Sequence, residues 1–312
     1  MRTRTFQSLL FEFSRASFFQ ILCACLQHHN SHVAVHKHLP HRQERDFRGL
    51  VVVVLALISL SMLCGGCKDK RQRPINVIGS TSIQPFAEFL AEELRAMKAA
   101  ANVDVQGGGS TAGLQALANG IADIAMCSRS LTKEEEASFT PIVIARDGLA
   151  VVVHRMNPVN ELSNQQIQML FSGQVGNWKE VGGESEPVRL IMREEGSGTR
   201  EAFVNLVMDK ARVSRKALVQ ESNGAVKELV KNDPAAIGYM SLGLVSAELK
   251  VLSVDGIRPT MSEVSAGRYR LSRPFLFVVK ADLRQEAKQF IDFVLSAEGQ
   301  RLLEMEGLVK AK

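Results

Sequence analysis

One stretch of eight residues, 193–200, restricts most strongly what this chain can fold into. It reads Arg-Glu-Glu-Gly-Ser-Gly-Thr-Arg, follows the apolar run 188–192, and precedes apolar residues at helical spacing in 201–208. This order predicts a buried strand, a glycine-rich turn and a helix start. The first N–H groups of a helix lack partners and its dipole favours negative charge, so such a turn can hold a small oxyanion. A capped turn without a ligand is the alternative, because Ser and Thr are ordinary N-cap residues.

Two other turns in the chain have the same chemistry. A predicted strand at 74–79 leads into Ser80-Thr81-Ser82-Ile83-Gln84-Pro85 and a helix, and a strand at 102–106 leads into Gly107-Gly108-Gly109-Ser110-Thr111 and a second helix. A further strand, predicted over 120–129, ends in Ser128-Arg129. Turns of this kind, together with Arg129 and Arg193, predict one site at which several helix N-termini converge.

Strand–turn–helix units alternate along the body of the chain, which predicts an α/β fold with largely parallel sheets. The chain runs apolar again at 142–144 and 149–153, and Ser163-x-x-Gln166 is a capping box that opens a helix ending at Gly173. Further strands are predicted at 237–240 and 275–279, before amphipathic helices at the C-terminal end. With 312 residues, the chain has room for two compact domains.

Charge and histidine content exclude several functions. The formal net charge is +5, but residues 1–67 hold seven Lys/Arg and three Asp/Glu, which leaves 31 basic and 30 acidic residues in 68–312. Nucleic-acid binding requires a clustered basic surface, so we expect no nucleic-acid partner. His154 is the sole histidine of the body, and a strand position is its simplest interpretation. We therefore expect no metal site and no cofactor, and Cys127, the sole body cysteine, can form no disulfide there.

The N-terminal segment has the pattern of an export signal. Residues 49–63 carry no charge and follow Arg42, Arg45 and Arg48, and the run is short for a membrane-spanning helix. The sequence Cys64-Gly65-Gly66-Cys67 then resembles a bacterial lipoprotein cleavage box with Cys67 as the lipid acceptor, although Cys64 stands where an aliphatic residue is usual. A zinc or redox Cys-x-x-Cys is the alternative, but no second pair exists to complete it. Residues 1–48 are expected to be an extension that is absent from the mature protein.

Several of these stretches together resemble the substrate-binding protein of the bacterial phosphate ABC transporter. The resemblance covers roughly 74–312, and the Gly-Ser-Gly-Thr block at 196–199 is its most specific part. The segments that carry it are 79–85, 107–113, 122–129, 193–200, 236–239 and 293–300.

The resemblance implies a periplasmic binding protein type II fold, in which two α/β lobes are joined by a two-stranded hinge and close on the ligand. We expect lobe I at 75–150 and 250–312, and lobe II at 151–249. The implied function is extracytoplasmic binding of inorganic phosphate and its delivery to the permease subunits of an ABC transporter in the inner membrane. The protein would be a lipid-anchored monomer of the periplasm and not an enzyme.

The resemblance also implies a set of phosphate ligands. They are hydroxyls, backbone N–H groups and guanidinium groups, which suit a desolvated dianion because charge-assisted hydrogen bonds are strong. The residues are Ser82, Ile83, Ser110, Arg129, Arg193, Ser197, Gly198 and Thr199.

Arg129 departs from the family pattern, since many members have an Asp there that accepts the proton of hydrogen phosphate, a proton that sulfate lacks. Arg129 cannot accept a hydrogen bond. It is expected to pair with the anion or with Glu195, which is also the nearest candidate acceptor for the proton. The sequence therefore leaves the basis of selectivity for phosphate over sulfate open.

Three alternative functions remain. A binding protein for sulfate, molybdate or tungstate would need a similar site. A serine hydrolase would need Gly-x-Ser-x-Gly, but Ala112 stands two places after Ser110 and Thr199 two places after Ser197. The third is an adhesion or signalling lipoprotein that kept the fold and lost the ligand.

Overall fold

The computed structural model describes residues 73–97 and 102–311. The predicted N-terminal extension, the predicted export signal and Cys67, the predicted lipid acceptor, lie outside these ranges. Within them, no helix combines the length and the apolar character that crossing a membrane requires.

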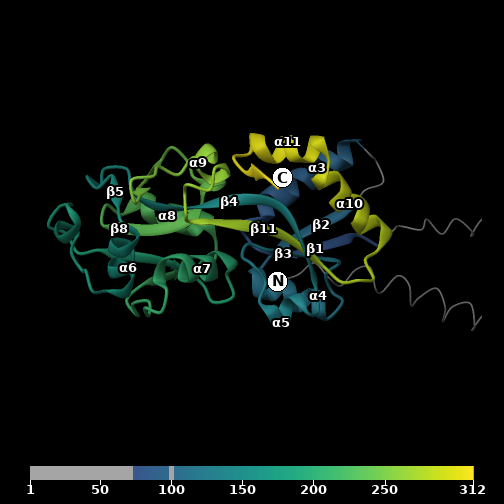
Figure 1. The fold of residues 1–312 in the computed structure, drawn as a ribbon, viewed down its shortest axis with the longest axis horizontal. Helices are drawn as coiled ribbons and strands as arrows, with labels where there is room; N and C mark the ends of the chain where they lie inside the picture. The colour runs from purple at the N-terminus through teal and green to yellow at the C-terminus, as the bar shows by residue number, and fades with distance from the viewer. Residues whose placement is uncertain (1–72, 98–101, 312) are drawn as a thin grey trace, which may run out of the picture. The chain divides into compact units, whose positions relative to one another are not determined.

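The first lobe is a mixed sheet with helices on both faces (Figure 1). Its strand order is β2-β1-β3-β11-β4, where β4 spans Thr140–His154, and β1 is parallel to both β2 and β3. One face packs against α3, α10 and α11 through a large apolar cluster, and the other packs against α4. The elements are β1 (Ile75–Gly79), α3 (Gln84–Met97), β2 (Val103–Gly107), α4 (Ser110–Ala118), β3 (Ile124–Cys127), α5 (Lys133–Glu136), β11 (Ser272–Val279), α10 (Gln285–Leu295) and α11 (Ala297–Met305).

The second lobe continues from the other half of β4 in the order β4-β8-β6-β7, with β9 also paired to β4. Helices α6 and α7 cover one face of this sheet, and α8 covers the other. The elements are β5 (Glu161–Leu162), α6 (Asn164–Ser172), η1 (Trp178–Val181), β6 (Arg189–Arg193), α7 (Gly198–Phe203), the π-helical turn η2 (Val204–Met208), β7 (Leu218–Gln220), α8 (Asn223–Asn232), β8 (Ala236–Ser241), η3 (Leu242–Leu244), β9 (Leu249–Val251), β10 (Ser253–Val254) and α9 (Met261–Ser265).

Two antiparallel segments carry the chain between the lobes. β4 (Thr140–His154) pairs with β11 through residues 140–148 and with β8 through residues 149–153, so one strand belongs to both sheets. The chain returns beside it, since the N–H of Leu149 donates to the carbonyl of Leu271 at 2.7 Å and Ser272 pairs with Gly148. Near the C-terminus, β12 (Val309–Lys310) adds to the same strand. This pair of crossing segments is the two-stranded hinge of the predicted fold (Figure 1).

The core packing divides the chain differently from the boundary expected at residue 250. Leu252, Val254 and Tyr269 lie in the apolar cluster of the second lobe, together with residues of β4, α6 and β8. The chain therefore returns to the first lobe at the start of β11, because residues 252–271 bury their apolar side chains in the second.

The sheets are parallel on either side of the hinge, but β4 and β11 are antiparallel to their neighbours, so the expectation of largely parallel sheets holds only away from the crossing.

Candidate anion-binding site

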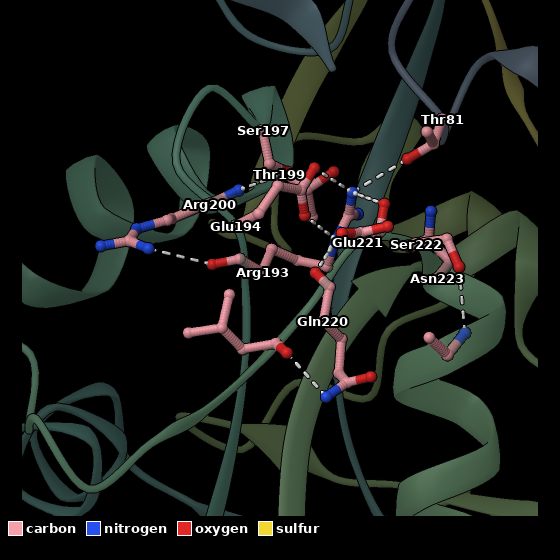
Figure 2. A network of polar contacts seen from close by, with 12 residues as sticks. Thr81, Arg193, Glu194, Ser197, Thr199, Arg200, Gln220, Glu221, Ser222 and Asn223 are labelled. Carbon is pink, nitrogen blue, oxygen red and sulfur yellow. Dashed lines mark hydrogen bonds and ion pairs between the residues drawn. The ribbon is translucent and has the colours of Figure 1, made fainter. Parts of the chain in front are cut away.

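Four helices begin where strands of the two sheets end. β1 and β2 lead into α3 and α4 of the first lobe, and β6 and β7 lead into α7 and α8 of the second. Because parallel strands end at the same edge of a sheet, each lobe presents its turns together. The turn before α8, Ser222-Asn223-Gly224, joins the three predicted turns, and Figure 2 shows it beside the turn of 193–200.

Two predicted hydroxyls meet across the lobes. Ser82 Oγ lies 2.7 Å from Thr199 Oγ1, and both residues are about 1% exposed. Each oxygen also accepts a hydrogen bond from a side chain that sequence reasoning did not include in the site. Asn223 Nδ2 donates to Ser82 at 2.9 Å, and Arg273 Nη1 donates to Thr199 at 2.7 Å.

Ser110 and Gly198 lie against each other at the same place. Ser110 is fully buried, and its Oγ accepts from the N–H of Ser128 at 3.2 Å. A Cβ atom at Gly198 would lie 2.2 Å from Ser110 Oγ and 2.8 Å from Ser128 Oγ. The start of α7 can therefore approach the first lobe this closely only with glycine at 198.

Two other predicted ligands have local partners. Ser197 Oγ caps α7 by accepting from the N–H of Arg200 at 3.3 Å, so its hydroxyl hydrogen is still available to donate. The N–H of Ile83 donates to the carbonyl of Ser80 at 3.1 Å, within the turn before α3. The Ile83 N–H is therefore engaged in this structure, although sequence reasoning assigned it to the ligand.

Arg193 is the most buried cation of the turn 193–200 and carries a free donor. Its guanidinium holds both carboxylate oxygens of Glu194 at 2.9 Å and, through Nη2, Thr81 Oγ1 of the other lobe at 2.9 Å and the carbonyl of Glu221 at 3.1 Å (Figure 2). Nη1 is buried and, among the described residues, has no hydrogen-bond partner. A buried donor without an acceptor costs about 1–3 kcal/mol, so this atom indicates where a ligand would bind.

Arg129 has two carboxylate partners, neither of which is Glu195. Its Nη1 and Nη2 donate to Glu135 at 2.7 and 2.9 Å, and its Nε lies 2.5 Å from Glu201 Oε2, at an angle outside hydrogen-bond geometry. The bond to Glu135 raises the pKa of Arg129 above its ordinary value and lowers that of Glu135. Glu195 is 91% exposed and contacts Arg200 at 3.6 Å. The expected Arg129–Glu195 pair is wrong, because Glu195 points to solvent.

Asp147 and Arg273 form a fully buried ion pair at the hinge, which the sequence analysis missed. Arg273 Nε and Nη2 hold Asp147 Oδ2 at 3.0 and 2.9 Å, and Ser241 Oγ donates to Oδ1 at 2.9 Å. Burial raises the pKa of Asp147, against the opposing effect of Arg273. Asp147 stands in a short polar break between two apolar runs, whereas nothing in the local sequence marks Arg273 as a site residue.

The remaining predicted positions lie away from the site or support it locally. Asp123 accepts from the N–H of Asn76 at 2.9 Å and pairs with Arg284, as expected of a residue that serves the strand turn. His154 ends β4, and Trp178 is a buried anchor whose Nε1 donates to the carbonyl of Ala235 at 2.9 Å. In the described part of the chain, no group of three or more His, Cys, Asp or Glu side chains could hold a metal ion.

Comparison with known proteins adds independent findings. Residues 68–298 match the profile of the PBP superfamily domain. The crystal structure of a putative phosphate ABC transporter substrate-binding protein from Clostridium perfringens, with bound phosphate, is 38% identical, with a TM-score of 0.75 over 77% of this chain and 100% of that one. An ABC-type phosphate transport receptor from Vibrio cholerae is also 38% identical, with a TM-score of 0.65 over 75% of this chain and 99% of that one. Phosphate-binding protein PstS of Borreliella burgdorferi is 27% identical over 275 residues, 84% of this chain and 99% of that protein.

Proposed function

We propose that this chain binds inorganic phosphate between its lobes and delivers it to a permease. The chain belongs to the PBP superfamily and, within it, to the substrate-binding proteins of phosphate ABC transporters. The phosphate-bound relative from Clostridium perfringens supports the choice of ligand. The protein would act outside the cytoplasm, as a monomer anchored through a lipid on Cys67.

The observation that carries this proposal is the buried Nη1 of Arg193, which has no hydrogen-bond partner within residues 73–97 and 102–311, on a guanidinium that also contacts the Thr81 hydroxyl of the other lobe. The ligand set would include the predicted hydroxyls and the Gly198 N–H, extended by Asn223 and Arg273. Micromolar affinity needs about 8 kcal/mol. Several charge-assisted hydrogen bonds, each contributing about 1.5–3 kcal/mol, would suffice.

The hydrogen bonds already present direct the hydroxyls toward an anion. Ser82 and Thr199 accept from Asn223 and Arg273, so the hydrogen of each hydroxyl is left to donate. One of them now donates to the other at 2.7 Å, and both could donate to a tetrahedral oxyanion. Arg129, held by two carboxylates, would contribute less to the ion than sequence reasoning assigned to it.

The same contacts argue against catalysis. A Ser or Thr nucleophile needs a neighbour that accepts its proton. The neighbours of Ser82 and Thr199 are an amide NH2 group and a guanidinium, which donate instead. A chromogenic phosphoester should therefore not be hydrolysed, and turnover that disappears in Ser197→Ala would favour the hydrolase alternative.

Calorimetric titration of the purified protein with phosphate, sulfate, molybdate and tungstate tests the ligand. We expect micromolar or tighter binding of phosphate and much weaker binding of the other anions. Tighter binding of sulfate than of phosphate would overturn this choice, and a heat of zero with every anion would favour a protein that kept the fold without the ligand.

The lipid anchor has a separate test. Cells fed a labelled fatty acid should incorporate the label into the wild type but not into Cys67→Ser. Cys64→Ser is the matched control, because it changes the neighbouring thiol and should keep the label. Loss of the label in Cys64→Ser alone would move the anchor to that residue.

A further inference from the structure

The candidate ligand side chains are enclosed. Ser82, Ser110 and Thr199 are at most 1% exposed, so an ion cannot reach them while the lobes stay together. Each lobe has its own apolar clusters, and β4 and the segment entering β11 cross between them. Entry and release therefore require the lobes to separate about this crossing, and every polar contact across the gap breaks and re-forms with each binding event.

One of these contacts is an ion pair. Arg129 follows β3 in the first lobe, and Glu201 lies in α7 of the second, with 2.5 Å between Nε and Oε2. The same carboxylate accepts from Thr111 Oγ1 of the first lobe at 3.3 Å, and the N–H of Thr111 donates to the carbonyl of Gly196 at 3.1 Å. The first lobe thus holds Glu201 through two side chains.

Arg129 is fixed within its own lobe before this contact forms. Its Nη1 donates to Glu135 and to the carbonyl of Ser130 at 3.0 Å, and Glu135 also accepts from the N–H of Thr132 at 2.9 Å in the capping box of α5. The side chain is 6% exposed. Its Nε edge is therefore presented to α7 in a set position, with little rotamer entropy left to lose on closure.

We propose that Arg129 and Glu201 form a latch between the lobes, an ion pair made only in the closed form that slows phosphate release without touching the ion. This inference rests on the proposed function and assigns Arg129 a different role from that of a ligand.

The two roles predict opposite effects of Glu201→Gln. If Arg129 bound phosphate, removing the competing carboxylate would strengthen the attraction and tighten binding. If the pair is a latch, the amide loses the charge contact, and the closed form is less favoured. We expect phosphate to bind roughly tenfold more weakly, within the usual range of coupling between sites. Most of the change should lie in the dissociation rate, measured by stopped flow.

Glu195→Gln is the matched control, because it removes an exposed carboxylate of the same turn, whose ion pair is with Arg200 of its own lobe. It should bind phosphate like the wild type. Arg129→Gln should weaken binding as Glu201→Gln does, and the double variant should be no weaker than the weaker single one, because both changes remove one contact. Thermal unfolding of each variant checks that the fold is kept.

Unchanged or tighter phosphate binding in Glu201→Gln would overturn the latch. If the wild type binds no phosphate, the proposed function fails separately, and small-angle X-ray scattering of the ligand-free proteins decides on the latch. A larger radius of gyration in Glu201→Gln than in the wild type and Glu195→Gln would support it, whereas equal radii would overturn it.

Discussion

Three arginines reach the candidate site, and each has a carboxylate beside it. Arg193 holds Glu194, Arg129 holds Glu135 and Arg273 holds Asp147. Because a buried charge without a partner is costly, this pairing lets the chain keep the guanidinium groups in place before a ligand arrives. An incoming anion then meets N–H and O–H donors that are already oriented. The positive charges of the guanidinium groups are already balanced by carboxylates of the protein.

Thr199 lets the contribution of one hydroxyl be measured. Thr199→Val keeps the shape of the side chain and removes the donor, so phosphate affinity should fall about tenfold or more, the effect of a hydrogen bond to a charged group. Titration calorimetry gives the value. Thr140→Val is the control, because Thr140 is an exposed threonine of β4. Equal affinity in Thr199→Val and the wild type would remove Thr199 from the site.

Replacing Arg193 tests whether anion binding requires the shape of the guanidinium group or only its positive charge. Arg193→Lys keeps the positive charge but supplies a single nitrogen. That nitrogen cannot replace the guanidinium, which donates to Glu194 and Thr81 and leaves Nη1 for the anion. We expect phosphate affinity to fall by roughly a hundredfold, about 2.7 kcal/mol. An affinity within a factor of three of the wild type would show that charge alone is sufficient.

Local patterns in the sequence predict some of the site residues. Ser82 and Thr199 each stand in a Gly- and hydroxyl-bearing turn, and the structure places them in contact across a separation of 117 residues. Asn223 and Arg273 carry no such signal, because an Asn at a helix start and an Arg in a strand have ordinary structural roles. Their function depends on tertiary contacts with the two hydroxyls, which no local pattern encodes.

At the scale of elements, the beginning of α7 in the second lobe packs directly against the first lobe. Gly198 lies against the hydroxyls of Ser110 and Ser128 without room for a side chain. Thr199 directly follows Gly198 in α7. The close approach of the helix start to the first lobe therefore also brings the Thr199 hydroxyl to Ser82.

Gly198→Ala should therefore hold the lobes apart. The added Cβ would lie 2.2 Å from Ser110 Oγ, so α7 must withdraw from the first lobe, and phosphate binding should fall by more than a hundredfold while each lobe stays folded. Binding is measured by calorimetry and folding by circular dichroism. Gly176→Ala, where a Cβ meets no atom within 4 Å, should behave like the wild type. Micromolar binding in Gly198→Ala would contradict the packing argument.

Elements with capping signals were predicted well, and the hinge strand was not. The helix opened by Ser163 has the predicted capping box and ends at Gly173 in the left-handed conformation. By contrast, the apolar runs 142–144 and 149–153 form one strand of 15 residues, β4. The polar residues between them interrupt the apolar pattern, and the sequence does not reveal that Asp147 pairs with Arg273, 126 residues away.

At the scale of the whole molecule, the Asp147–Arg273 pair connects the hinge to the site. Asp147 lies in β4 beside the crossing, where it pairs in register with Arg273 of β11, and its carboxylate also accepts from Ser241 of the second lobe. Arg273 donates to Thr199 in the second lobe and to the carbonyl of Ser128 in the first. One buried guanidinium thus contacts both lobes, the hinge and a candidate ligand, so its loss should affect stability as well as binding.

Arg273→Met should destabilise the protein by about 3–5 kcal/mol at pH 8, because it leaves the Asp147 carboxylate buried without its counter-charge. Burial already raises the pKa of Asp147 above its ordinary value of 3.8, and removing Arg273 raises it further. A carboxyl whose pKa is raised in the folded state stabilises the fold when protonated and loses that contribution as the pH rises through the folded pKa. The deficit of Arg273→Met relative to the wild type in urea unfolding should therefore shrink between pH 8 and pH 4.5. Asp147→Asn/Arg273→Met, which lacks the titrating carboxyl, should show no such shrinkage, and an equal deficit of Arg273→Met at both pH values would contradict this account.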